Sequence, residues 1–160
     1  SDLGNVAQLD REISEALAEK TPTDTIVKAG KTAKYGIGSI ATLRKASGHL
    51  YLLAYCEMNQ ANEASSTPDA IWRSLALLWE EVSRTANGAP VAISVIGGGQ
   101  SRLSHVLPAQ DSIRLMILSF MFACRTKRVC DELRIVVRPQ DFERLDRLEL
   151  RAFLASLKQS

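Results

Sequence analysis

The stretch from Val91 to Ser104, VAISVIGGGQSRLS, joins a strand-like segment to three consecutive glycines and then to a helix-like segment. Residues 91–96 are apolar and rich in β-branched side chains, which predicts a strand buried in the protein. Glycine adopts positive φ angles at little steric cost and lets other groups come close to the backbone. A buried strand that enters a helix through such a loop is typical of an α/β fold, with a ligand near the loop.

Outward from this stretch, strands and helices alternate along the chain. The pattern predicts helices over 6–20, 67–86, 108–126 and 139–157, and extended segments over 25–29, 37–43, 49–56, 91–96 and 133–137. The apolar residues of the last helix, from Phe142 to Leu157, are expected to face the core. The segment 49–56 is apolar on both faces, which predicts a strand inside the sheet. We therefore expect a single α/β domain over 1–160: a mixed, mostly parallel sheet flanked by helices in three α/β/α layers.

Composition and charge narrow the class of protein. A chain of 160 residues is long enough for one domain, and 46% hydrophobic with 24% charged residues is the balance of a soluble globular protein. The net charge of +2 gives no field that would select nucleic acid. The 3 cysteines and 2 histidines form no metal-ligand pattern, so no metal site is expected. The longest apolar run, residues 115–124, is about half of a membrane span.

The glycine loop is predicted to bind phosphate. Consecutive glycines expose backbone N–H groups in a concave nest, and the N-terminus of the following helix adds partial positive charge. A serine hydroxyl and an arginine can add hydrogen bonds to phosphate oxygens. The alternative is that the glycines serve turn geometry alone, because the loop has neither the GxGxxG nor the GxxxxGK[ST] pattern. The predicted phosphate-binding residues are Gly97, Gly98, Gly99, Gln100, Ser101 and Arg102.

Two further segments are candidates for contact with the same ligand. Ile37, Gly38 and Ser39 form a second glycine-rich bend, for which ribose contact is the functional interpretation and a bulge or turn is the alternative. Met58 and Asn59 follow the end of a strand and are predicted to face the same crevice, although an exposed polar loop explains them equally well. No pair of side chains is placed for acid–base chemistry, so no catalytic residues are predicted.

The order of motifs resembles that of a macro domain. The segments that carry the resemblance are YGIGSIATL (35–43), LYLLAYC (50–56), IWRSLALLW (71–79), AISVIGGGQS (92–101) and LRIVVRP (133–139). In macro domains, the strand equivalent to 92–96 leads into a phosphate-binding loop for ADP-ribose. The combination of YGIGSIATL with GGGQSRL is more narrowly similar to the divergent macro-like domains of bacterial Thoeris antiphage systems.

This resemblance implies a sensor rather than an enzyme. In Thoeris systems the macro-like domain is the sensing part of a membrane-anchored effector, and it binds an ADP-ribose-bearing signal that a TIR-domain partner makes from NAD. The expected ligand is thus ADP-ribose or its conjugate with an imidazole-bearing group such as histidine. The resemblance further implies a homo-oligomer without a nucleic-acid partner. We expect a cytoplasmic domain of an inner-membrane protein, with membrane contact only through segments outside this chain.

Two departures from the family pattern leave alternatives open. The first strands of a macro domain, with an adenine-binding aspartate and an Asn-rich phosphate loop, are not found, which implies a fragment of a larger effector. The asparagine and acid of macro-domain hydrolases have no match, so sensing is favoured over an ADP-ribosyl hydrolase; an ADP-ribose reader is the related alternative.

Trp72 and Trp79 lie on one predicted helix and favour core or interface packing. A third alternative is therefore a protein-interaction module that uses this helix.

Overall fold

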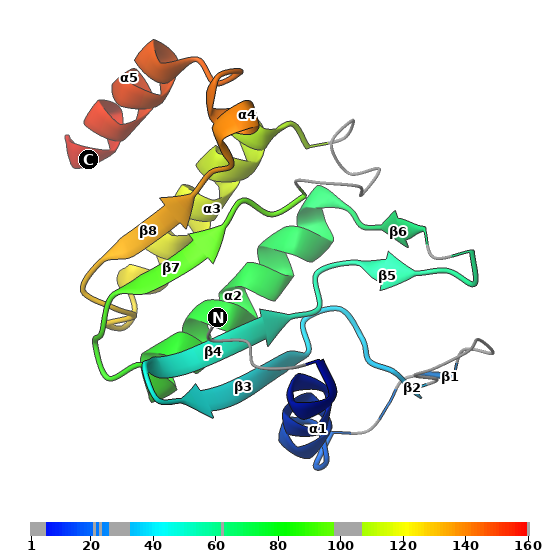
Figure 1. Ribbon diagram of the computed structural model, residues 1–160. Coiled ribbons are helices and arrows are strands. Elements are labelled where there is room, and N and C mark those ends of the chain that lie inside the picture. Colours follow the sequence, from blue (N-terminus) through cyan, green and yellow to red (C-terminus); the bar gives the residue numbers. More distant parts are fainter. Residues whose placement is uncertain are drawn as a thin grey trace.

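A β-hairpin lies between two helices, one on each of its faces (Figure 1). The computed structural model describes residues 6–20, 22, 24–25, 33–61, 63–97 and 107–159. The helices are α1 (Val6–Ala16), α2 (Pro68–Thr85), α3 (Ala109–Cys124), α4 (Pro139–Phe142) and α5 (Arg147–Lys158). The strands are β1 (Asp24–Thr25), β2 (Ala33–Lys34), β3 (Ile40–Lys45), β4 (Gly48–Leu53), β5 (Glu57–Met58), β6 (Ala64–Ser65), β7 (Val91–Ser94) and β8 (Leu133–Val136).

The hairpin of β3 and β4 has a helix on each face. Successive side chains of a strand point to opposite faces of the sheet. The Thr42 hydroxyl of β3 donates a 2.7 Å hydrogen bond to the Glu81 carboxylate of α2. Lys45, which points the other way, forms an ion pair with Glu12 of α1. The hairpin is therefore held between α2 and α1, which is the three-layer arrangement that the sequence predicts (Figure 1).

The helix α2 supplies more buried core residues than any other described element. It begins as predicted, with Pro68 at its first position and the Thr67 side chain accepting a 3.1 Å hydrogen bond from the N–H of Ala70. Trp79 is fully buried, and its indole N–H donates to the Ser119 hydroxyl of α3 at 2.9 Å. The predicted core packing of Trp79 is thus confirmed. The other large apolar residues that α2 buries are Ile71, Leu75, Leu78 and Val82.

The strands β7 and β8 pair in parallel, with Val91 opposite Leu133 and α3 in the crossover between them. The other described strand pairs are antiparallel, and β4 is hydrogen-bonded to β3 but not to β7. The mixed α/β class is confirmed, but parallel pairing is less frequent than expected. The reason lies in Ala46 and Ser47, because so short a connection can join only antiparallel strands. Gly48 follows with a φ of +131°, a conformation that favours glycine.

The C-terminal segment differs from the single helix predicted over 139–157. The chain forms α4, a turn and then α5, because the Asp146 side chain caps a new helix by accepting a 3.0 Å hydrogen bond from the N–H of Glu149. An ion pair between Arg114 and Glu149 holds the first turn of α5 to α3. The rest of α5 projects from the body (Figure 1) and has no buried residue. The expected core position of Leu148 is wrong, since this residue is 78% exposed.

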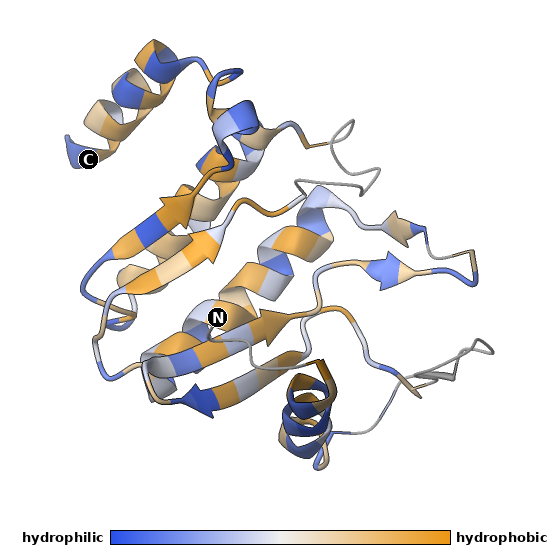
Figure 2. Ribbon diagram, viewed as in Figure 1, coloured by the Kyte–Doolittle hydropathy of each residue, from blue (hydrophilic) through white to orange (hydrophobic). Residues whose placement is uncertain are grey.

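Apolar residues concentrate in β4, β7 and β8 and along α3, whereas α1 is largely hydrophilic (Figure 2). None of the helices in the described ranges combines the length and hydropathy that a bilayer crossing requires. Within the same ranges, no three His, Cys, Asp or Glu side chains gather in a group that could hold a metal ion.

Candidate functional site

The strands β4 and β7 run in the same direction, and their carboxyl ends point to the same side of the molecule (Figure 1). Tyr55 follows the end of β4, and Ile96 follows the end of β7. Both residues line the same groove. A hydrogen bond joins the backbone of Gly97 to the phenol of Tyr55. The space beyond the carboxyl ends of parallel strands is where open α/β proteins bind their ligands, so this corner is the candidate site.

Gly97 has a backbone conformation that glycine adopts far more readily than other residues. Its φ is +81°, and the residue is buried. One residue earlier, the carbonyl of Ile96 accepts a 2.7 Å hydrogen bond from the hydroxyl of Ser112, which is fully buried in the first turn of α3. The start of the glycine loop is therefore anchored to α3 through Ile96 and to the end of β4 through Gly97.

Tyr55 connects the two strand ends to the start of α2. Burial raises the pKa of its phenol, and the hydrogen bond from the Gly97 backbone lowers this pKa by a smaller amount, so the phenol stays protonated at neutral pH. Its carbonyl accepts a 2.6 Å hydrogen bond from Ser66, which precedes the N-cap of α2. Sequence reasoning missed Tyr55. The extended segment predicted over 49–56 placed Tyr55 inside the strand, whereas β4 ends at Leu53 and leaves Tyr55 beyond it.

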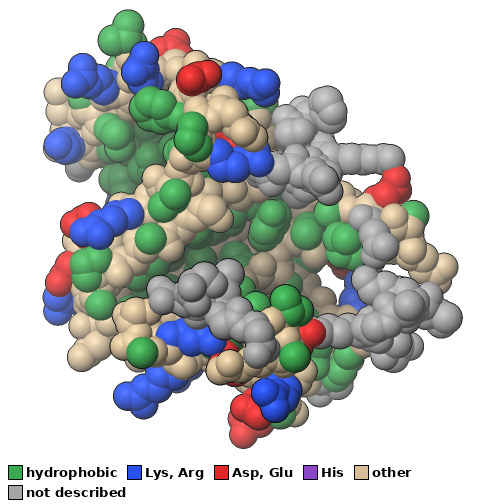
Figure 3. Space-filling view, viewed as in Figure 1, with side chains coloured by type: hydrophobic (Ala, Val, Ile, Leu, Met, Phe, Trp, Pro, Cys, Tyr) green, Lys and Arg blue, Asp and Glu red, His purple; other side chains and the backbone are tan. Residues whose placement is uncertain are grey.

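A groove of about 430 Å³ runs between β4 and β7. Consecutive residues of both strands, 49–53 and 91–94, line it, so the groove follows the strand edges, while Leu78 and Val82 of α2 form its floor. Figure 3 shows apolar side chains along this hollow in the middle of the face. The described lining residues include no Asp, Glu, Lys or Arg. The groove therefore suits an apolar group, and a phosphate would need the loop at its carboxyl end.

Most of the predicted phosphate loop cannot be compared with the structure. The positions that lie outside the described residues are Gly98, Gly99, Gln100, Ser101 and Arg102. Gly97 is described, and it lies where the prediction places it, at the carboxyl end of a strand paired in parallel. Phosphate binding by this loop stays a prediction.

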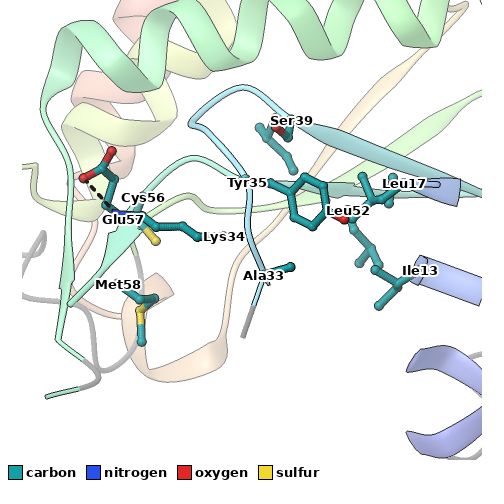
Figure 4. A pocket seen from close by; sticks show the side chains of 13 residues that line it. Ile13, Leu17, Ala33, Lys34, Tyr35, Ser39, Leu52, Cys56, Glu57 and Met58 are labelled. Atoms are coloured by element: carbon teal, nitrogen blue, oxygen red, sulfur yellow. Dashed lines mark ion pairs between the residues drawn. The ribbon is translucent and has the colours of Figure 1, made fainter. Parts of the chain in front are cut away.

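Ser39 and Met58 line different parts of a second cavity, of about 380 Å³, on the α1 side of the hairpin (Figure 4). Tyr35 also lines this cavity, and an ion pair of 3.6 Å joins Lys34 to Glu57 in its wall. The remaining wall is mostly apolar and includes Ile13, Leu17, Ala41, Leu52 and Cys56. Such a cavity can accept a small group that is largely apolar and makes a few polar contacts.

Ile37 and Gly38 lie in the turn that leads into β3. Gly38 has a φ of +93°, and its N–H donates a 2.6 Å hydrogen bond to the carbonyl of Ala54. A Cβ at this position would lie 2.6 Å from Cδ1 of Leu77, so close packing against α2 also favours glycine. The turn interpretation of this bend thus has a physical basis, and contact with a ribose stays a prediction.

Asn59 organises the turn between β5 and β6. Its side-chain oxygen accepts hydrogen bonds of 2.9 Å from the N–H groups of Ala61 and Glu63, and its amide nitrogen donates to the Glu63 carboxylate. These bonds give Asn59 a structural role, and its predicted ligand contact is untested. The predicted residues thus divide between two places: Gly97 lies beside Tyr55, whereas Ser39 and Met58 line the cavity on the α1 side.

Comparison with known proteins identifies the family. The family described as "Thoeris protein ThsA, Macro domain" matches residues 3–138, which is most of the chain. No curated protein matches the sequence. The family match agrees with the resemblance that the motifs indicate, and it covers β3 to β8, the strand ends at Tyr55 and Gly97, and both cavities. The chain therefore belongs to the macro domain family of the Thoeris protein ThsA.

Proposed function

We propose that this ThsA macro domain is a sensor that binds an ADP-ribose-type nucleotide derived from NAD and thereby activates an antiphage effector. Membership of the family gives the chain a macro-type, ADP-ribose-related ligand-binding role in Thoeris defence. The family match is the main observation that supports the proposal. The position of Gly97 at the carboxyl end of β7 supports placing the ligand at the glycine loop.

In this proposal the backbone amides of residues 97–101 hold a phosphate of the ligand, with help from Ser101 and Arg102. A loop of glycines leaves amide hydrogens open to an anion, and arginine and serine add directed hydrogen bonds. The fixed entry to the loop favours binding, because Ile96 and Gly97 are already held in place before any ligand arrives. Less of the binding free energy is then lost in ordering the loop.

The group attached to the diphosphate is proposed to be an imidazole-bearing group such as histidine. Ile37, Gly38, Ser39, Met58 and Asn59 are the proposed contacts for the ribose and this group. The mostly apolar cavity that contains Ser39 and Met58 has the character that such a group would need.

We propose binding without turnover, since no residues that match the asparagine and acid of macro-domain hydrolases are found in the sequence. A TIR-domain enzyme would make the signal, and ligand binding would change the association of a homo-oligomeric effector. This effector would be anchored in the inner membrane by segments outside the chain, with the domain in the cytoplasm.

Calorimetric titration of the purified domain tests this function. ADP-ribose, its histidine conjugate, NAD and adenosine are titrated separately, and saturable binding of one ADP-ribose compound is expected. Chromatography of the ligand after incubation should show it unchanged. Replacing Gly98 with Val should abolish binding while leaving the unfolding temperature close to that of the wild type, because a β-branched side chain would obstruct the nest. No heat with any ADP-ribose compound would refute the proposal.

A further inference from the structure

The helix α1 is only lightly packed on the hairpin. All of its residues are described, and none of them is buried, whereas Leu17, directly after the helix, is 9% exposed. The helix contacts β3, but two hollows of about 380 and 280 Å³ lie between α1 and the strands. Elements with few buried apolar contacts open locally at a lower free energy than the core does. We therefore expect α1 to open more readily than α2.

Two lysine side chains hold α1 on the hairpin. Lys45 of β3 forms an ion pair and a hydrogen bond with Glu12, and this hydrogen bond lowers the pKa of the Glu12 carboxyl, which therefore stays charged at neutral pH. Beyond the end of the helix, the Lys20 ammonium donates to the carbonyl of Ile40. Lysine carries its charge on a flexible four-carbon chain, so such contacts can persist while the helix shifts. The polar contacts orient α1 without fixing its distance from the strands.

The larger hollow is the cavity on the α1 side of the hairpin. Ile13 and Leu17 line it from the helix, and Ala41 and Leu52 line it from the strands, so the cavity lies between the two elements. Figure 4 shows Ile13 and Leu17 at one end of this cavity and Met58 at the other. An apolar group inside the cavity would contact the helix and the strands at once and add van der Waals contacts to both. Filling the cavity should therefore stabilise α1 on the hairpin.

We propose that α1 is the ligand-responsive element of this domain: the group attached to the nucleotide enters the cavity, packs against Ile13 and Leu17, and fixes α1 on the hairpin. This inference rests on the proposed function, and it adds contacts from α1 to those proposed for Ser39 and Met58. The ligand group is largely apolar or aromatic, because the residues on both sides of the cavity are apolar. ADP-ribose without an attached group should leave α1 unchanged.

Hydrogen exchange at the amides of α1 tests the inference. The domain is measured alone, with ADP-ribose and with the histidine conjugate of ADP-ribose, each compound at about 100 times its Kd. If only the form with α1 docked binds the conjugate, the conjugate should slow exchange in α1 by up to about 100-fold. ADP-ribose should leave this exchange unchanged. The amides of α5, which lines neither of the two cavities at the hairpin, are the internal control.

Substitutions at Ile13 show whether the cavity is responsible. Ile13→Trp fills part of the cavity from the helix, so it should slow exchange in α1 without ligand and weaken the Kd for the histidine conjugate at least about 10-fold, while the Kd for ADP-ribose stays the same. Val6→Trp is the matched control, because Val6 lies on the same helix and is 76% exposed. It should bind both compounds like the wild type.

Ile13→Ala covers the case in which Ile13→Trp does not fold. It removes apolar contacts from the helix side of the cavity, so it should weaken the Kd for the conjugate about 3- to 10-fold and leave the Kd for ADP-ribose unchanged. An unchanged Kd for the conjugate in this variant would overturn the proposal.

The outcomes distinguish this inference from the proposed function. If the wild type binds the conjugate and exchange in α1 stays the same, the role of α1 is refuted while the sensor function stands. Equal protection of α1 by ADP-ribose, or an equal loss of affinity in Ile13→Trp and Val6→Trp, would also refute it, because the cavity would then not be involved. If the wild type binds no ADP-ribose compound, the proposed function fails, and the role of α1 fails with it.

Discussion

The helices α2 and α5 have similar local features, yet only α2 belongs to the core. Each begins with a polar side chain that caps the first turn, Thr67 in α2 and Asp146 in α5. Each also carries apolar residues at helical spacing. α2 buries its apolar face against the hairpin and α3, whereas α5 has no buried residue. Spacing therefore predicts an apolar helix face, but burial of that face depends on a partner surface that the helix itself does not encode.

Removing the largest buried side chain of α2 should have the greatest effect on stability. Trp79→Ala deletes a fully buried indole and removes the N–H that donates to the Ser119 hydroxyl of α3, so we expect the free energy of unfolding to fall by about 3–5 kcal/mol. Trp72→Ala is the matched control on the same helix, since Trp72 is only half-buried and contacts Phe122 at the edge of α3. Denaturant unfolding should show a clearly smaller loss for Trp72→Ala, and equal losses would contradict the described core.

A substitution at Gly38 should have the next largest effect. Gly38→Ala places a Cβ against Leu77 of α2 and forces a side chain onto a residue with a φ of +93°. We expect a loss of about 1–3 kcal/mol from the backbone conformation together with this contact. The same substitution in a Leu77→Ala background removes the contact and keeps the backbone strain. A smaller loss in that background is expected in thermal unfolding, and an unchanged loss would assign the whole effect to the backbone.

The two helix caps provide the most direct test of the difference between α2 and α5. Thr67→Ala should lower the global free energy of unfolding by about 1 kcal/mol, because the N–H of Ala70 loses its acceptor in a helix that belongs to the core. Asp146→Ala removes the equivalent bond from the N–H of Glu149 in α5. We expect it to accelerate hydrogen exchange only at the amides of α5 and to leave global unfolding unchanged. A global loss from Asp146→Ala would show that α5 unfolds together with the core.

The smallest effect is expected at Leu148. This side chain is 78% exposed on α5, so Leu148→Ser should change the free energy of unfolding by no more than about 0.5 kcal/mol. Leu75→Ser on α2 is the control, because Leu75 is fully buried and its replacement puts a hydroxyl into the core. A large loss at Leu148 in chemical denaturation would mean that α5 packs against a surface in solution.

Local signals explain which parts of the fold could be predicted. Thr67, Pro68 and the spacing of the apolar residues fixed the start and the buried face of α2 from nearby residues alone. The antiparallel hairpin could also have been predicted, because Ala46 and Ser47 leave no room for a crossover. The exposure of α5 could not, since the same apolar spacing is compatible with a helix that packs and with one that projects.

In the candidate site, too, nearby residues predict some features, whereas others depend on contacts between distant parts of the chain. The strand followed by glycines predicts the place of Gly97, because this is a property of one continuous segment. The contact between Tyr55 and Gly97 joins segments that are separated by the whole of α2, and no local pattern pairs them. Ser39 and Met58 share a cavity because the turn before β3 brings residue 39 next to Ala54. This contact also joins separate segments, so no local pattern predicts it.

The contrast between the two strand pairs has a consequence for how the chain folds. β3 and β4 are neighbours in sequence and close through one short turn, whereas β7 and β8 can pair only after the whole of α3 has been placed. Bringing distant segments together costs chain entropy before any contact compensates for it. We therefore expect the hairpin to form early and the β7–β8 pair late in refolding, so that the candidate site at Gly97 is among the last parts of the molecule to form.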